Sequence, residues 1–176
     1  KLKKKINLDK QILELASLNE LFNYFGTDKG TEVTNQYQKN PSKTDQKLIG
    51  HGYAQFYEKH LNIYKNDKIN ILEIGTWKGA SVAAFYHYFK NAIIFCIDKN
   101  FKFKFESSRV NFFNCDTENF TDINNLEKYF IEKKSESFEV IIDDGSHNYT
   151  DILNNFQNFF KRIKPGGFYI IEDFNH

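Results

Sequence analysis

The sequence predicts an α/β fold in which helices cover both faces of a doubly wound, mainly parallel sheet. Three observations favour this class. From residue 53 onward, short apolar runs alternate with amphipathic segments; the runs show little apolar-polar alternation; and most of them end near a carboxylate. A strand that is apolar along its whole length is buried on both faces, which is typical of a parallel sheet between helices. At 176 residues the chain is long enough for one such domain.

The N-terminal part predicts one helix followed by a long loop. Apolar residues recur every three or four positions up to a glycine that is a natural helix end, namely Leu8, Ile12, Leu15, Leu18, Phe22, Phe25 and Gly26. Residues 26–50 are polar, and a loop of that length is either a functional lid or mobile. We therefore expect a helix with a lid-like loop in residues 1–52 and the sheet domain in residues 53–176.

The sheet domain predicts five strands in alternation with helices. The expected strands are residues 68–74, 92–97, 110–114, 138–142 and 168–171. The expected helices are residues 53–64, 80–89, 126–133 and 149–163, with His60 and His87 on their exposed sides. Pro165-Gly166-Gly167 predicts a turn into the last strand.

Composition narrows the functional classes. The net charge is +1, so we expect no nucleic-acid partner. No apolar run is long enough for a membrane span, and no secretory signal follows the basic start. Cys96 and Cys115 are expected to be reduced core thiols of a cytoplasmic protein. The absence of methionine, even at position 1, and the end of the chain just after the last expected strand suggest a fragment.

Residues 141–147, Ile-Ile-Asp-Asp-Gly-Ser-His, are the most informative stretch. A buried strand ends there in Asp143 and Asp144, and unpaired buried carboxylates are costly unless something binds them. Glu172 and Asp173 end the last expected strand in the same way. In open α/β sheets, ligands bind at the carboxyl ends of the strands. The sequence therefore predicts a site at this edge.

A second pattern follows the first strand, where Gly75 and Gly79 bracket a turn into a helix. Glycine lets a backbone approach a ligand, and a helix N-terminus offers free N–H groups; an ordinary tight turn is the alternative. Asp98, after the second strand, is placed to accept from the hydroxyls of a ribose or to cap the strand end. Asp116, after the third, is placed to accept from an adenine amino group or to cap a loop.

From about residue 53 to residue 173, the sequence resembles class I S-adenosylmethionine-dependent methyltransferases. The resemblance rests on five motifs in this order: LEIGTWKGAS, the acid of CID, the acid of NCD, IIDDGSH and KPGGFYIIED. The resemblance implies a Rossmann-like fold, with two further strands that this sequence lacks. It implies S-adenosyl-L-methionine as cofactor, bound by Glu73, Gly75, Thr76, Gly79, Ser81, Asp98 and Asp116.

A narrower resemblance rests on YFGTDKG (24–30), HGYAQFYEKH (51–60), IDDGSH and IIED. These are similar to bacterial metal-dependent sugar O-methyltransferases, including macrolide-sugar enzymes of the mycinamicin and demethylmacrocin type. This implies Mg²⁺, or another divalent cation, on Asp144, Glu172 and Asp173, with His147 as the base and Asp143 facing the cofactor. Lys29 and Tyr53 are expected near the cofactor; a solvated loop and helix packing are the alternatives.

The implied chemistry suits these residue types. Carboxylates form a hard oxygen site for such a cation, which lowers the pKa of a sugar hydroxyl, and an imidazole takes the proton near neutral pH. One geometric objection remains, because adjacent residues in a regular strand point to opposite faces, and this applies to Glu172 and Asp173.

The sequence thus favours a methyltransferase that acts on a sugar or another small-molecule acceptor, and a homo-oligomer is compatible with it. Two other hypotheses compete with this one. One changes the acceptor to a phosphorylated or acidic small molecule and needs no metal. The other is a non-catalytic binding module with the same fold.

Overall fold

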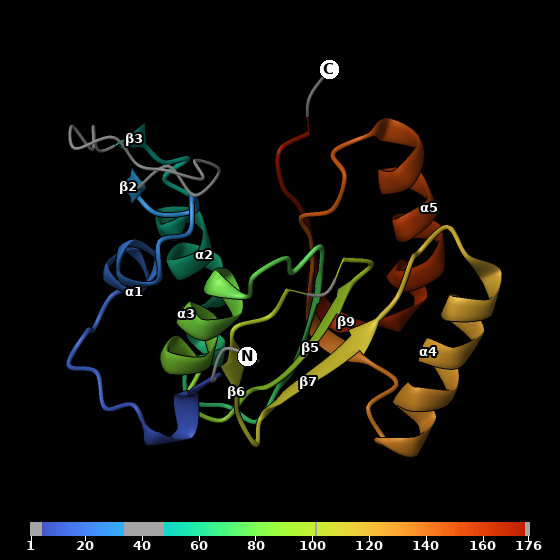
Figure 1. Ribbon diagram of the computed structural model, residues 1–176, viewed down its shortest axis with the longest axis horizontal. Coiled ribbons are helices and arrows are strands. Elements are labelled where there is room, and N and C mark those ends of the chain that lie inside the picture. The colour runs from blue at the N-terminus through green and yellow to red at the C-terminus, as the bar shows by residue number, and fades with distance from the viewer. Residues whose placement is uncertain (1–4, 34–47, 101, 175–176) are drawn as a thin grey trace.

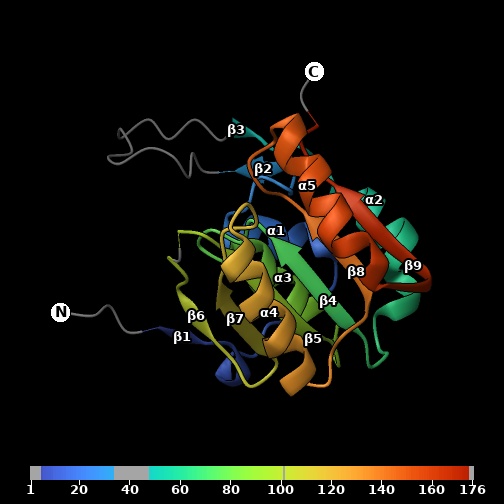
Figure 2. The ribbon, with the colours of Figure 1, turned by 90° about the vertical axis from the view of Figure 1, so that its right-hand side faces the viewer.

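The sheet has five strands in the order β7-β5-β4-β8-β9, and every neighbouring pair is parallel. The computed structural model describes residues 5–33, 48–100 and 102–174. The strands are β4 (Asn70–Ile74), β5 (Ile93–Asp98), β7 (Val110–Asn114), β8 (Phe138–Asp143) and β9 (Ile163–Ile171). Figure 2 shows β4 near the middle, with β8 and β9 on one side of it. The expected fold class and all five strands are confirmed.

Helices cover both faces of the sheet, as expected. On one face lie α1 (Leu18–Phe25), α2 (Ala54–Leu61) and α3 (Ala80–Tyr88), and on the other lie α4 (Phe120–Glu132) and α5 (Tyr149–Phe159) (Figure 1). Short 3₁₀ turns follow α2 (Asn62–Tyr64) and α5 (Phe160–Arg162). Each face has its own apolar cluster, one built around Phe22, Tyr57 and Phe85 and the other around Phe95 and Phe130. No helix in the described residues is long and apolar enough to cross a membrane.

Two small strand pairs lie beside the main sheet. β1 (Ile6–Asn7) runs parallel to β6 (Phe105–Glu106), and β2 (Glu32–Val33) runs antiparallel to β3 (Leu48–Ile49). Residues 34–47, the middle of the expected lid-like loop, lie outside the described residues. The two cysteines are buried free thiols, as expected.

The expected helix from Leu8 to Phe25 is wrong in its first half. A 3₁₀ turn at Leu8–Lys10 is followed by extended chain, in which Ile12 is 93% exposed. The helix begins only at Leu18, because Ser17 and Glu20 form a capping box: each side chain accepts from the other residue's backbone N–H. Its end at Gly26, in the left-handed conformation, is as expected.

Three further expectations need correction. α4 begins at Phe120, earlier than expected, because Asn119 caps its first N–H groups. Pro165-Gly166-Gly167 lies inside β9, at a register shift against β8; proline is tolerated there because β9 is an edge strand. His87 is buried, with its ring stacked on Phe25 at 5.6 Å, since α1 packs over α3.

The order of the strands creates a switch point between β4 and β8. The chain runs from β4 outward through β5 to β7, and then returns to the other side of β4 as β8. The backbones that leave β4 and β8 meet there, where Asp144 N–H donates to the carbonyl of Ile74 at 2.9 Å. This is the position at which open α/β sheets bind ligands.

Candidate active site

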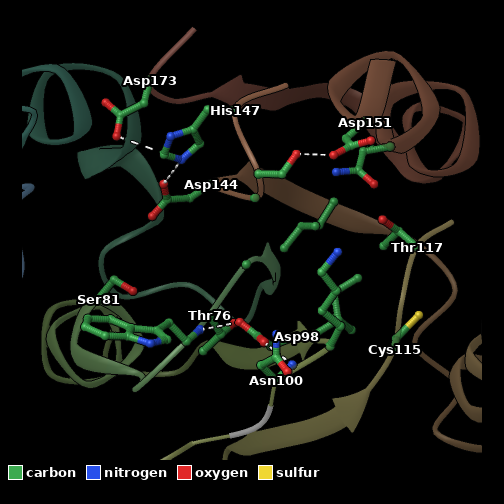
Figure 3. Close-up of a pocket in the computed structure, with 18 of the residues that line it drawn as sticks. Thr76, Ser81, Asp98, Asn100, Cys115, Thr117, Asp144, His147, Asp151 and Asp173 are labelled. Atoms are coloured by element: carbon green, nitrogen blue, oxygen red, sulfur yellow. Dashed lines mark hydrogen bonds and ion pairs between the residues drawn. The ribbon is translucent and has the colours of Figure 1, made fainter. Parts of the chain in front are cut away.

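A cleft of about 350 Å³ lies at the carboxyl ends of β4, β5, β7 and β8 (Figure 3). It spans the switch point, as the fold leads one to expect. Eight of the residues expected in the site line it: Gly75, Thr76, Ser81, Asp98, Asp116, Asp144, His147 and Asp173. The remaining six expected residues do not line the cleft: Lys29, Tyr53, Glu73, Gly79, Asp143 and Glu172.

The turn after β4 depends on Gly75. Its φ of 86° is in the left-handed region, and a Cβ there would overlap the backbone carbonyl of Asp144. Gly75 N–H donates to the carbonyl of Ile97 at 2.9 Å, so the turn is also held against the end of β5. Gly79 does not line the cleft; it caps α3 at a φ of 81° beneath the ring of Phe103.

Asp98 is fixed at the mouth of the cleft by the backbone. One carboxylate oxygen accepts from Trp77 N–H and the other from Asn100 N–H, both at 2.6 Å. Asp116 is held less firmly and accepts from Glu118 N–H at 3.2 Å. Both acids thus cap a local turn and also line the cleft, so the two expectations for each are compatible.

Asp144, His147 and Asp173 form a cluster at the opposite end of the cleft. His147 Nε2 lies 3.3 Å from Asp144 Oδ1 and 4.0 Å from Asp173 Oδ2 (Figure 3). The other Asp173 oxygen accepts from Tyr53 Oη at 2.5 Å and lies 3.0 Å from His51 Nδ1. Tyr53 therefore contacts this cluster rather than lining the cleft.

The backbone is strained around the cleft. Among the described residues, four other than glycine have a positive φ, and three of them line the cleft: Trp77 at 46°, His147 at 60° and Asp173 at 50°. Each such residue costs of order 1–3 kcal/mol, and this strain concentrates at functional sites. The sequence analysis did not predict these positive φ angles.

Glu172 and Asp173 diverge, as the geometric objection required. Glu172 is 5% exposed and accepts hydrogen bonds from Lys29 Nζ and Tyr57 Oη below the cleft. The positive φ of Asp173 turns the next side chain toward the cleft instead. Asp173 is thus grouped with Asp144 and His147, while Glu172 pairs with Lys29, which also contacts Asp144.

Lys29, which we expected near the cofactor, does not line the cleft; its side chain is buried against Asp144, which does. Its Nζ lies 2.5 Å from Asp144 Oδ2 and also binds Glu172. Burial alone would raise the pKa of Asp144, but Lys29 and His147 outweigh it and hold that pKa below its usual value. The hydrogen bond that Asp144 accepts from His147 in turn raises the pKa of His147 against the opposing effect of burial.

Asp143 and Glu73 lie beneath the cleft. Asp143 does not face the cleft as expected, because it is the last residue of β8 and its side chain points into the α5 side, where it accepts from Asn155 Nδ2 at 3.1 Å. Burial raises its pKa to about 6. Glu73 is fully buried, and burial raises its pKa to about 7 in spite of Lys29 and Ser81.

Asn155 is a site residue that sequence reasoning missed. It lines the cleft and supports Asp143 from α5. A signal was present, because Asn155 lies three residues after Ile152 and four before Phe159, on the buried face of that helix. A polar residue on an apolar face needs a polar partner.

The donor set fits a divalent cation in part. Single ligand atoms of Asp144, His147 and Asp173 lie within 4.8 Å of one another, and two of the three groups are carboxylates of the hard type that Mg²⁺ prefers. Asp144 and Asp173 are therefore the residues that would hold a cation. Glu172 lies outside this group, bound to Lys29 and Tyr57.

The comparisons with known proteins agree with this geometry. A family model described as a methyltransferase domain matches residues 72–174. The chain belongs to this methyltransferase family. The match begins in β4 and ends just after Asp173, so it includes the whole cleft edge of the sheet.

Curated relatives of this methyltransferase-family chain are O-methyltransferases, by their names. It is 28% identical to the demethylmacrocin O-methyltransferase of Streptomyces fradiae, over 70% of this chain and 32% of that protein. It is also 28% identical to the mycinamicin VI 2''-O-methyltransferase of Micromonospora griseorubida, over 70% of this chain and 31% of that protein. The chain thus spans about a third of the length of the curated relatives it matches.

A solved structure with the same fold is that of the MycE methyltransferase from the mycinamycin biosynthetic pathway, in complex with Mg and SAH. The match has a TM-score of 0.69 and 25% identity, over 89% of this chain and 37% of that one. A second MycE structure, which also contains mycinamycin VI, matches with the same TM-score over 91% of this chain and 40% of that one.

Proposed function

We propose that this chain transfers a methyl group from S-adenosylmethionine to a hydroxyl of a sugar. The observation that carries the proposal is the layout of the cleft. A glycine turn with a fixed carboxylate lies at one end, and a carboxylate–imidazole cluster lies at the other. The sugar class is supported by two further relatives, whose names describe O-methylation of compounds that carry a rhamnosyl or an olivosyl group.

The glycine-turn end suits a nucleoside. Asp98 is held by two backbone N–H groups, so its carboxylate keeps a fixed direction and can accept from ribose hydroxyls. Thr76, Ser81 and Asp116 line the same part of the cleft. Glu73 and Gly79 do not line the cleft, so in this proposal neither residue contacts the cofactor. Glu73 is buried beneath the turn, and Gly79 shapes its backbone at the start of α3.

The acid end suits deprotonation of a hydroxyl. When bound, the cofactor supplies a methyl group on a sulfonium, and a divalent cation supplies a Lewis acid beside Asp144 and Asp173. The acceptor oxygen forms the new O–CH₃ bond as the S–CH₃ bond breaks and the sulfur keeps that electron pair. His147 takes the hydroxyl proton. Its hydrogen bond with Asp144 holds a proton on Nε2, which leaves Nδ1 as the accepting nitrogen.

The N-terminal segment contributes to the site in this proposal. Thr27 and Asp28 line the cleft, which supports a covering role for the described part of the N-terminal segment, ahead of a sheet domain in residues 53–176. A cytoplasmic location remains part of the proposal, and the two buried free thiols are compatible with a reducing compartment.

Binding and methyl transfer test the proposal in sequence. Calorimetry with S-adenosylhomocysteine should give saturable binding, and methyl glycosides of rhamnose, glucose and galactose should gain one methyl group, detected by mass spectrometry. Chelation with EDTA should abolish transfer, and MgCl₂ should restore it. Absence of cofactor binding would contradict methyl transfer, and cofactor binding without methylation of any glycoside would contradict the sugar assignment. Turnover that EDTA leaves unchanged would contradict a role for a metal ion in the reaction.

A further inference from the structure

Lys29 is buried next to the acid cluster, against residues that follow the two strands β8 and β9. It is 1% exposed, and its Nζ contacts Asp144 at the end of β8 and Glu172 just after β9. A lysine is almost never fully buried unless it is paired. Removing a charge from water is costly, so the two carboxylates must offset the burial of this ammonium.

The two carboxylates have a partner on each oxygen. The second oxygen of Glu172 accepts from Tyr57 Oη, and the second oxygen of Asp144 faces His147 Nε2 at 3.3 Å. Asp144 therefore lies between Lys29 on one side and His147 on the other. The orientation of the Asp144 carboxylate depends on both contacts.

The backbone that carries Lys29 is anchored on both sides. The carbonyl of Asp28 accepts from His51 N–H at 2.7 Å, and the carbonyl of Gly30 accepts from Gly52 N–H at 3.1 Å. Gly50 packs so closely that a Cβ on it would overlap the carbonyls of Gly30 and Asp28. The place of Lys29 is thus fixed by main-chain contacts as well as by its ion pairs.

We propose that Lys29 is a positioning residue for the reaction: its buried ammonium orients the Asp144 carboxylate, and through it His147, while it neutralises Glu172. This inference rests on the proposed methyl transfer. It also reassigns Lys29, because the residue acts on Asp144 and Glu172 and does not itself line the cleft.

The main test is Lys29→Met, which keeps an unbranched side chain of similar length and removes the charge. We expect the rate of glycoside methylation to fall about 10- to 100-fold, as for loss of a group that orients an active-site ligand. The affinity for S-adenosylhomocysteine should change by about twofold at most. This split separates a positioning role from a general loss of structure.

Lys164→Met is the matched control. Lys164 Nζ lies 2.5 Å from Glu139 Oε1, and both residues belong to the amino-terminal halves of their strands, away from the cleft. Loss of this ion pair should leave the methylation rate within about twofold of wild type.

A second comparison keeps the inference testable if Lys29→Met folds poorly. The double variant Lys29→Met/Glu172→Gln leaves no unpaired carboxylate at Glu172, so its urea unfolding midpoint should exceed that of Lys29→Met. Its methylation rate should fall no further than that of the slower single variant, because the two residues act as a unit.

The outcomes separate the possibilities. A Lys29→Met rate within twofold of wild type would overturn the inference, as would a loss of cofactor affinity equal to the loss of rate. A wild-type protein without turnover would contradict the proposed function instead. The urea unfolding midpoints would then test the ion pair between Lys29 and Glu172. A Lys29→Met midpoint equal to that of the double variant would refute this ion pair.

Discussion

The two ends of the cleft are held in place by contacts of different range. At the glycine-turn end (Gly75 to Gly79 with Asp98), Asp98 binds backbone N–H groups only 2 and 21 residues away. At the acid end (Asp144, His147 and Asp173), the contacts Lys29–Asp144 and Tyr53–Asp173 join residues 115 and 120 positions apart. One end is built within the two neighbouring strands β4 and β5 and their turns, and the other by contacts between distant parts of the chain, so a substitution at one end should leave the other end intact.

The largest expected effect is that of His147→Ala. Loss of a general base should lower the methylation rate about 10²- to 10⁴-fold, while the affinity for S-adenosylhomocysteine at the other end stays within about twofold. His60→Ala is the control, because the ring of His60 on α2 packs against Phe56 of the same helix and Phe168 of β9, outside the cleft. Equal losses of rate and cofactor affinity would show that the two ends are not independent.

Asp98→Ala should produce the opposite pattern. Removal of a charged acceptor should weaken S-adenosylhomocysteine binding about 10- to 100-fold in calorimetry. The rate at saturating cofactor should change much less, because the acid end keeps its long-range contacts. A variant that binds the cofactor normally would refute the ribose role of Asp98 and leave only its turn-capping role.

The pH dependence of the rate should report on the acid end alone. Because the hydrogen bond with Asp144 raises the pKa of His147 above 6.5, the base form is lost at a higher pH than for a free imidazole. The value of kcat/KM should therefore fall about tenfold per unit as the pH drops below that raised pKa. Cofactor affinity should stay level over the same range. A rate that falls only well below pH 6 would argue against His147 as the base.

The smallest expected effect is that of Asp116→Asn. This side chain accepts one backbone N–H at 3.2 Å and lies on the rim of the cleft, and asparagine keeps an acceptor oxygen. The affinity for S-adenosylhomocysteine should change by about twofold. A tenfold loss would instead support a direct contact between Asp116 and the adenine amino group.

Local patterns predicted the glycine-turn end and the strands correctly. Continuous apolar runs identified all five strands, and the expected turn at Gly75 is present, with that residue in the left-handed region. The same kind of reasoning failed where a stronger local signal was overlooked. The spacing from Leu8 to Phe25 suggested one helix, but the capping box of Ser17 and Glu20 starts the helix at Leu18.

The acid end was predicted in its residue types but not in the direction of every side chain. Sequence placed Asp143, Asp144, Glu172 and Asp173 at one edge, and the structure agrees with that. It could not say which of two adjacent acids faces the cleft, because that depends on where each strand ends and on a positive φ at Asp173. Nor could it pair Lys29 with acids more than a hundred residues away.

By itself, the sequence determined a parallel sheet between helices, a glycine turn after the first main strand, and acids at the carboxyl ends of the strands, because hydrophobic periodicity and glycine are local signals. Only the tertiary structure decided that Asp144, His147 and Asp173 meet in one cluster while Asp143 and Glu172 are buried beneath it. The reason is physical. A buried charge is tolerated only where a partner of opposite charge is brought to it, and the fold alone brings Lys29 to Asp144 and Glu172.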